Sequence, residues 1–179
     1  MSSTDPPSNL TRRRGDAEKR TGKAPSSRVP PRLRASASVL FRRPAADLRP
    51  RALQLFAGRL QREIARGRAF DCLLTGDAEM RRLNRQFRGK DYTTDVLSFP
   101  APAPVPHLGD LAISVQRARA QARQFGHAPE EEVRILMLHG LLHLLGMDHE
   151  NGDGRMQRSE KRWRLRLGLP GGLIERVQP

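Results

Sequence analysis

The spacing of apolar and polar residues changes along this chain between the period of a helix and that of a strand. Helical spacing predicts five helices, at residues 50–67, 77–87, 116–124, 129–145 and 155–167. Short apolar runs predict strands at residues 36–41, 69–75, 95–100 and 108–115. Because strands and helices follow each other in irregular order, the pattern indicates an α+β fold rather than a regular βαβ array.

Glycines and prolines set several of the predicted boundaries. Pro129 suits the first position of the fourth helix, and three glutamates follow it where acids favour the positive helix end. Asp77 is predicted to cap the second helix, and Gly89 to end it. Pro100 is expected to close the third strand, because proline cannot continue a hydrogen-bonded ladder.

The fourth helix carries the residues with the clearest chemistry. His139 and His143 are four residues apart in the most apolar segment, so a helix would place both rings on one face. Gly146 can adopt the left-handed conformation that ends a helix, and the chain could then bring His149 to the same point. Three imidazoles with one open position are the ligand set of a catalytic zinc site. The alternative is that these histidines pack in the core, which would require other partners for their buried ring nitrogens.

The histidine spacing is similar to that of the metzincin zinc peptidases, with one difference. Gly140 occupies the position at which those enzymes have a glutamate that acts as general base. Glycine cannot transfer a proton. The sequence therefore argues against a zinc peptidase and favours another hydrolysis, although a peptidase stays as an alternative.

Composition adds a second indication of the substrate. The chain of 179 residues has a net charge of +14, which favours a polyanionic partner such as nucleic acid over an acidic membrane surface. Residues 1–36 contribute a net +6, so the remainder is itself basic at +8. Residues 1–35 are rich in Ser, Pro and basic side chains and are predicted to be a disordered tail. The lone cysteine, Cys72, and the shortness of the longest apolar run indicate a cytoplasmic protein without a membrane span.

Three segments together resemble the YbeY family of bacterial endoribonucleases. The segment from His139 to His149 matches the family's zinc motif except at Met147. Leu83–Asn84 through Phe87–Arg88–Gly89–Lys90–Asp91 to Asp95–Val96–Leu97–Ser98–Phe99–Pro100 matches a second motif, and Leu108–Gly109–Asp110 to Ser114 a third. Met156 and Glu160 fall where the family places a methionine and a glutamate. The resemblance covers about residues 37–170.

This resemblance implies a structure and an activity. It implies one α+β domain at residues 36–170, with a mixed, roughly four-stranded sheet packed by helices and a metzincin-like zinc helix, followed by a tail at 171–179. It implies one zinc ion bound by His139, His143 and His149, and a catalytic arginine, Arg88. The activity implied is single-strand-specific endoribonuclease cleavage in ribosomal RNA processing (small-subunit 3′-end maturation) and in ribosome quality control. The partners would be ribosomal RNA and ribosome-associated proteins, and a monomer is expected.

Several points stay open at the level of sequence. Arg88 could hold a phosphate in two hydrogen bonds or be a surface residue at a helix end. Asp95 and Asp110 could order a loop or orient a zinc-binding histidine. No residue stands out as general base, the 2′-hydroxyl of RNA could itself attack, and three imidazoles would also bind nickel or copper. With one Tyr, one Trp and six Phe, base stacking is expected to contribute little. A zinc-stabilised module that binds RNA or the ribosome without cutting is the third alternative.

Overall fold

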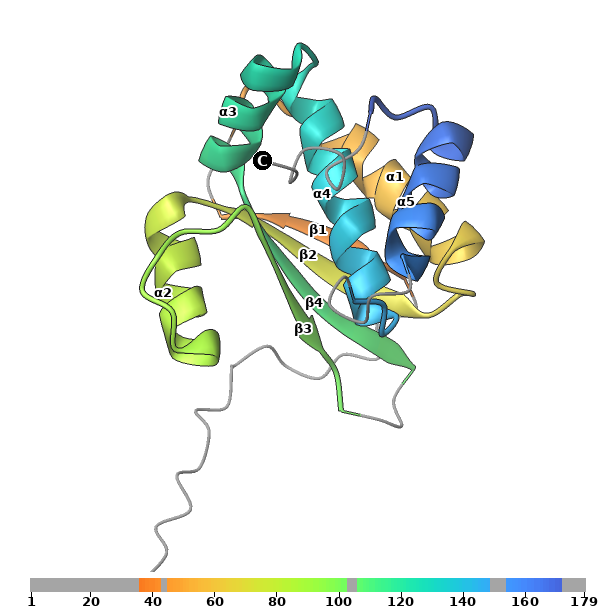
Figure 1. Ribbon diagram of the computed structural model, residues 1–179, viewed down its shortest axis with the longest axis horizontal. Coiled ribbons are helices and arrows are strands. Elements are labelled where there is room, and N and C mark those ends of the chain that lie inside the picture. The colour runs from red at the N-terminus through yellow and green to blue at the C-terminus, as the bar shows by residue number, and fades with distance from the viewer. Residues whose placement is uncertain (1–35, 43–44, 103–105, 149–153, 172–179) are drawn as a thin grey trace, which may run out of the picture. The chain divides into compact units, whose positions relative to one another are not determined.

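The computed structural model describes residues 36–42, 45–102, 106–148 and 154–171, which all belong to one compact unit, Leu33–Pro179. A four-stranded sheet lies at its centre (Figure 1). The strands are β1 (Ser38–Phe41), β2 (Ala69–Thr75), β3 (Val96–Pro100) and β4 (His107–Ser114). The helices are α1 (Pro50–Glu63), α2 (Asp77–Arg88), α3 (Val115–Phe125), α4 (Pro129–Leu144) and α5 (Arg155–Leu167). The predicted order of elements and the α+β class are confirmed.

The sheet is mixed, as expected. Its strand order is β1-β2-β4-β3, with β1, β2 and β4 parallel and β3 antiparallel to β4. Strand β3 is therefore an edge strand, and it ends at Pro100, where the ring removes a ladder donor.

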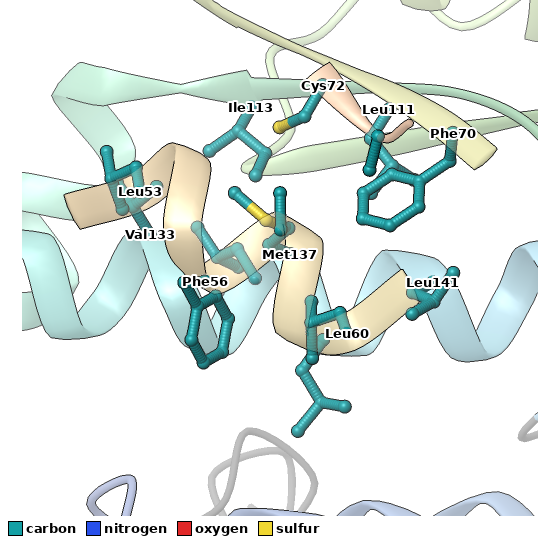
Figure 2. Packing of buried hydrophobic residues seen from close by; sticks show 14 of the residues in the cluster. Leu53, Phe56, Leu60, Phe70, Cys72, Leu111, Ile113, Val133, Met137 and Leu141 are labelled. Carbon is teal, nitrogen blue, oxygen red and sulfur yellow. The ribbon is translucent and has the colours of Figure 1, made fainter. Parts of the chain in front are cut away.

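The two faces of the sheet are covered differently because side chains alternate along β4. Leu111 and Ile113 face the main core, which α1 and α4 complete (Figure 2). Ala112, between them, joins a smaller cluster with Met80 of α2 and Leu97 of β3. Helices α1 and α4 thus cover one face, whereas α2 packs on the other, as Figure 1 shows.

Helix α4 lies in the main core along most of its length. Its side chains at Val133, Met137 and Leu141 meet α1 and the sheet and are fully buried. Apolar burial of this extent stabilises by roughly 2 kcal/mol per large side chain. A helix held in this way provides a rigid support for the histidines that it carries.

An ion pair joins the starts of α1 and α4. Glu130 accepts hydrogen bonds from the backbone and the guanidinium of Arg49, at 3.0–3.1 Å, and Arg134 also contacts it. The hydrogen bond from Arg49 is the main cause that holds the pKa of the Glu130 carboxyl below its usual value. The carboxylate therefore fixes the start of α1, at which no side chain caps the helix.

The predicted cap of α2 is wrong in one detail. Gly76, in an extended conformation, is the N-cap, and Asp77 is the first helical residue. The Asp77 carboxylate instead accepts a hydrogen bond from the Ser114 hydroxyl at 2.5 Å, and that hydroxyl in turn caps α3 by accepting from the backbone of Arg117. Asp77 thus links α2 to Ser114, the residue that caps α3. A local sequence pattern cannot reveal a contact between residues so far apart in the chain. Gly89 ends α2 in the left-handed conformation, as predicted.

Three further predictions concern Cys72, membrane-spanning helices and the two tails. Cys72 is buried in the core, and burial raises the pKa of its thiol, which fits a packing role. Within the described part of the chain, no helix is long and apolar enough to cross a bilayer. The predicted tails, 1–35 and most of 171–179, lie outside the described residues, so these boundaries stay predictions.

Candidate metal centre

Helix α4 brings His139 and His143 together, as their spacing predicts. Their Nε2 atoms lie 3.2 Å apart, and the ring centroids are 4.9 Å apart with the planes at 73°. Both side chains are partly buried. The two nitrogens therefore converge on one point at the surface of the core.

Glu160 of α5 holds the first of these rings. Its Oε2 lies 2.9 Å from the Nδ1 of His139, and only 2% of the glutamate is exposed. A carboxylate can only accept, so this hydrogen bond requires the tautomer with the proton on Nδ1, in which the Nε2 lone pair faces the convergence point. A histidine that binds a metal characteristically donates its other ring nitrogen to such a carboxylate. In the sequence, Glu160 falls where the YbeY family places a glutamate. The sequence alone does not assign it this hydrogen bond to a histidine.

The end of α4 supports the expected turn. Gly146 has φ of +80°, and the amides of Gly146 and Met147 bond the carbonyls of His143 and Leu142. This left-handed glycine ends the helix as predicted. His149, the third expected ligand, lies outside the described residues.

Gly140 has a packing role that explains why the protease glutamate is absent. A Cβ at this position would lie 2.8 Å from Leu111 Cδ2 and 3.2 Å from Val96 Cγ2. The Ser98 hydroxyl also donates to the Gly140 carbonyl at 3.2 Å. Helix α4 thus approaches the sheet so closely that a side chain at position 140 would require Leu111 and Val96 to shift. A glutamate there would point into the sheet rather than toward a metal.

The described residues fit a metal ion. Two nitrogens each about 2.0 Å from a tetrahedral ion are separated by about 3.3 Å, close to the 3.2 Å observed between the two Nε2 atoms. Nitrogen ligands of this kind suit zinc, and also copper or nickel. With one orienting carboxylate in place, the geometry is that of a prepared ligand pair.

Arg88 lies apart from the histidines. It is exposed at the last position of α2, on the other side of the sheet from α4. Among the described residues its guanidinium forms no hydrogen bond or ion pair, so this group is available to an anion. The structure does not bring it into contact with His139 or His143.

Asp95 and Asp110 do not orient the histidine pair. Asp95 accepts from the backbone of Val96 at 2.8 Å and from the amide of Gln121 at 2.9 Å, so it orders the start of β3. Asp110 lies 3.4 Å from the Nε2 of His107. Of the two roles open for Asp95, loop ordering is the one that the structure supports.

A second group of possible ligands lies on β2 and β4. Asp71, His107 and Asp110 place ligand atoms within 4.8 Å of one another. Asp71 and Asp110 are neighbours in the strand register, and Asp110 is exposed. This His/Asp group is a possible metal site, but within the described ranges no carboxylate outside the group bonds its histidine. Its histidine, His107, is therefore a suitable control residue for experiments on the histidine pair.

A pocket of about 520 Å³ opens elsewhere, at the C-terminal ends of β2 and β4. Its charged groups are paired: Arg42 and Arg82 bond Glu79, and Arg119 bonds Asp47. Neither histidine of the pair lines it, nor does Arg88. The candidate site is therefore identified by the histidine pair and its carboxylate and not by the volume of a pocket.

Replacing Glu160 with glutamine is expected to weaken metal binding by about 10- to 100-fold. Glutamine keeps the size of the side chain but presents a neutral amide to His139 Nδ1 in place of a carboxylate. Zinc affinity, measured by competition with a chromophoric chelator, reports this loss directly. The control is Glu131→Gln, a change on the same helix as the histidines but in its first turn. Equal zinc affinity in wild type and Glu160→Gln would mean that this carboxylate does not orient a ligand.

Comparisons with known proteins identify the family. The family model described as endoribonuclease YbeY matches residues 45–167. An endoribonuclease YbeY of Solibacter usitatus is 67% identical over 141 residues, which cover 79% of this chain and 95% of that protein. Another, from Koribacter versatilis, is 43% identical over 139 residues, covering 78% and 91% of the two chains.

A solved structure agrees with the fold. The solution structure of a Thermotoga maritima protein is 28% identical and covers 71% of this chain and 85% of its own, with a TM-score of 0.51. Residues 45–167, which match the family model, include α4, α5 and the two strands β3 and β4 that pack against Gly140. The chain belongs to the YbeY family of endoribonucleases.

Proposed function

We propose that this chain is a metal-dependent endoribonuclease that cuts ribosomal RNA at a zinc ion held by His139, His143 and His149. Family membership supplies the class of reaction. The observation that carries the proposed site is the convergence of two Nε2 atoms at 3.2 Å, with Glu160 bonded to the far side of one ring. We propose one zinc per chain, because the described residues contain one histidine pair of this kind.

The residues of the chain would share the work as follows. When bound, zinc supplies Lewis-acid catalysis, which polarises a phosphoryl oxygen and makes water more acidic. Glu160 keeps the proton of His139 on Nδ1 and so keeps Nε2 available. Gly140 fixes α4 against the sheet and thereby fixes both rings. Arg88 would hold a phosphate of the RNA in two hydrogen bonds and offset the charge that develops during cleavage.

Charge supports RNA as the substrate. The net charge of +14 attracts a polyanion. The arginines of α2 lie on an exposed helix face, as do those of α5 except the buried Arg164. We assign the cellular role of the family to this chain: small-subunit ribosomal RNA 3′-end maturation and ribosome quality control in the cytoplasm. The chain would act as a monomer on single-stranded RNA, with ribosome-associated proteins helping to select the target.

The two rival functions are less well supported. A zinc peptidase would need a general base at position 140, where this chain has a glycine whose Cβ position lies 2.8 Å from Leu111 Cδ2 in the sheet. A non-cutting RNA-binding module would not need a ligand pair that is oriented on a partly buried helix face. The hypothesis of a binding module specifically predicts that the chain binds RNA without cleaving it.

The experiment that separates these functions offers the full chain three substrates. These are a structured ribosomal RNA fragment with single-stranded segments, a fully double-stranded RNA and casein. The proposal expects cuts only in the single-stranded segments of the RNA, with ends mapped by primer extension. Cleavage of casein would favour the peptidase, whereas tight RNA binding without new ends would favour the binding module.

Replacing Arg88 with alanine is expected to lower kcat for RNA about 10²- to 10³-fold, as the loss of one transition-state donor commonly does. Because one phosphate contact disappears, the slope of log Kd against log salt should also fall by about 0.7 to 1. Arg82→Ala is the matched control on the same helix, since its guanidinium is engaged by Glu79. Equal effects of both substitutions would show that Arg88 contributes only general charge.

A further inference from the structure

Two aromatic rings are exposed near the C-terminal end of α2. Phe87 is 52% exposed and Tyr92 is 54% exposed. The whole chain has only eight aromatic residues, so two exposed rings within six positions are a concentration that burial in the core does not require. These two residues are called the α2 aromatic surface below.

The ring of Phe87 and the backbone of Tyr92 are held in place. Phe87 packs edge-on against Phe99 of β3, with ring centroids 5.0 Å apart. The backbone carbonyl of Tyr92 accepts a hydrogen bond from the buried Asn84 side chain at 2.8 Å. Arg81 binds the neighbouring Asp91 through two hydrogen bonds of 2.8 and 2.9 Å. Rings that are ordered before a ligand arrives lose little entropy when they bind it.

The charges around these rings favour a polyanion. Arg88 and Lys90 lie between Phe87 and Tyr92 in the chain, and neither forms an ion pair within the described residues. The Lys90 ammonium lies 5.9 Å from the centre of the Tyr92 ring. Exposed rings interleaved with unneutralised cations are the combination that binds single-stranded nucleic acid, by stacking on bases and attracting phosphates.

The surface also lies beside the candidate metal centre, across one strand. Ser98 of β3 bonds the carbonyl of Gly140 on α4. The next residue, Phe99, points to the opposite face and meets Phe87. Helices α2 and α4 both contact the edge strand β3, from opposite faces of the sheet (Figure 1). An RNA strand that passes over the edge could touch both.

We propose that Phe87 and Tyr92 form a stacking surface for unpaired bases of the RNA substrate, on the far side of β3 from the histidine pair. This proposal rests on the proposed nuclease function and specifies how that site selects single-stranded RNA. Paired bases are already stacked on their neighbours and cannot cover these rings. Preference for unpaired RNA would then come from the domain itself, contrary to the low stacking that the composition suggests.

The test measures binding of short single-stranded RNA to the full chain by fluorescence anisotropy. Phe87→Leu keeps an apolar side chain against Phe99 but removes the ring. It is expected to weaken binding at least about fivefold, the lower end of the effect of one lost stacking contact. Because stacking involves no counterion release, the salt slope should stay unchanged. The control is Phe125→Leu, a partly exposed phenylalanine at the end of α3.

A matched abasic RNA separates stacking from other causes. This oligonucleotide has the same phosphates but no bases, so wild type and Phe87→Leu should bind it equally. Phe87→Tyr, which keeps a ring, should restore binding of the normal RNA. Equal binding of normal RNA by wild type and Phe87→Leu, or an equal loss on the abasic RNA, would overturn the stacking proposal. Failure of the wild type to bind or cut RNA would instead overturn the proposed function.

Discussion

Replacing His143 with alanine is expected to reduce RNA cleavage by at least about a thousandfold. The substitution removes one of two Nε2 atoms that converge at 3.2 Å, the atoms that we propose as ligands of the ion. A metal contributes several kcal/mol to phosphoryl transfer, and each 1.4 kcal/mol corresponds to a factor of ten in rate. Cleavage of a ribosomal RNA fragment by identically prepared proteins measures the loss.

The matched control for this substitution is His107→Ala. His107 belongs to the second group of possible ligands and lies 3.4 Å from Asp110. The His107→Ala protein should retain wild-type cleavage if the histidine pair is the catalytic centre. A reversed result, in which His107→Ala is inactive and His143→Ala is active, would move the metal to the strands β2 and β4. Contaminating nucleases would be common to all three preparations.

Replacing Gly140 with glutamate is expected to destabilise the fold by about 3 kcal/mol or more, and not to create a peptidase. The new Cβ would lie 2.8 Å from Leu111 Cδ2 in the closed space between α4 and the sheet. Overpacking of a core costs about 1–3 kcal/mol, and burial of a carboxylate without a partner adds to this. Urea denaturation gives the free energy of unfolding, and casein cleavage tests for peptidase activity.

Gly140→Ala separates the two causes of this loss. Alanine adds the Cβ without the charge and also favours a helix by about 1 kcal/mol over glycine. We expect the free energy of unfolding of Gly140→Ala to lie between that of Gly140→Glu and that of the wild type. A Gly140→Glu protein as stable as wild type would show that α4 does not approach the sheet as closely as the structure has it.

The elements and the histidine pair could be predicted from sequence because both depend on local spacing. Helix α5 occupies the predicted residues 155–167, and β2 the predicted residues 69–75. An interval of four residues was enough to bring His139 and His143 together, since a helix fixes that geometry without help from the rest of the chain.

Features that depend on contacts between distant elements were missed. Glu160 lies 21 residues after His139 on another helix, so only the packing of α5 reveals its hydrogen bond to Nδ1. Asp77 has the sequence of a helix cap, yet its carboxylate bonds Ser114, 37 residues away. The exposure of Phe87 and Tyr92 could not be predicted either, because an apolar residue at a helix end can be buried or exposed according to its neighbours.

The most direct test of the metal-dependent mechanism is a zinc titration of the metal-free chain. The full chain is stripped with a chelator and dialysed, zinc is returned in steps, and RNA cleavage and bound metal are measured on the same samples. We predict no cleavage without metal and activity that rises in proportion to zinc up to one ion per chain, with His143→Ala inactive throughout. Undiminished cleavage by the metal-free chain would contradict the assignment of the histidines as a catalytic metal centre.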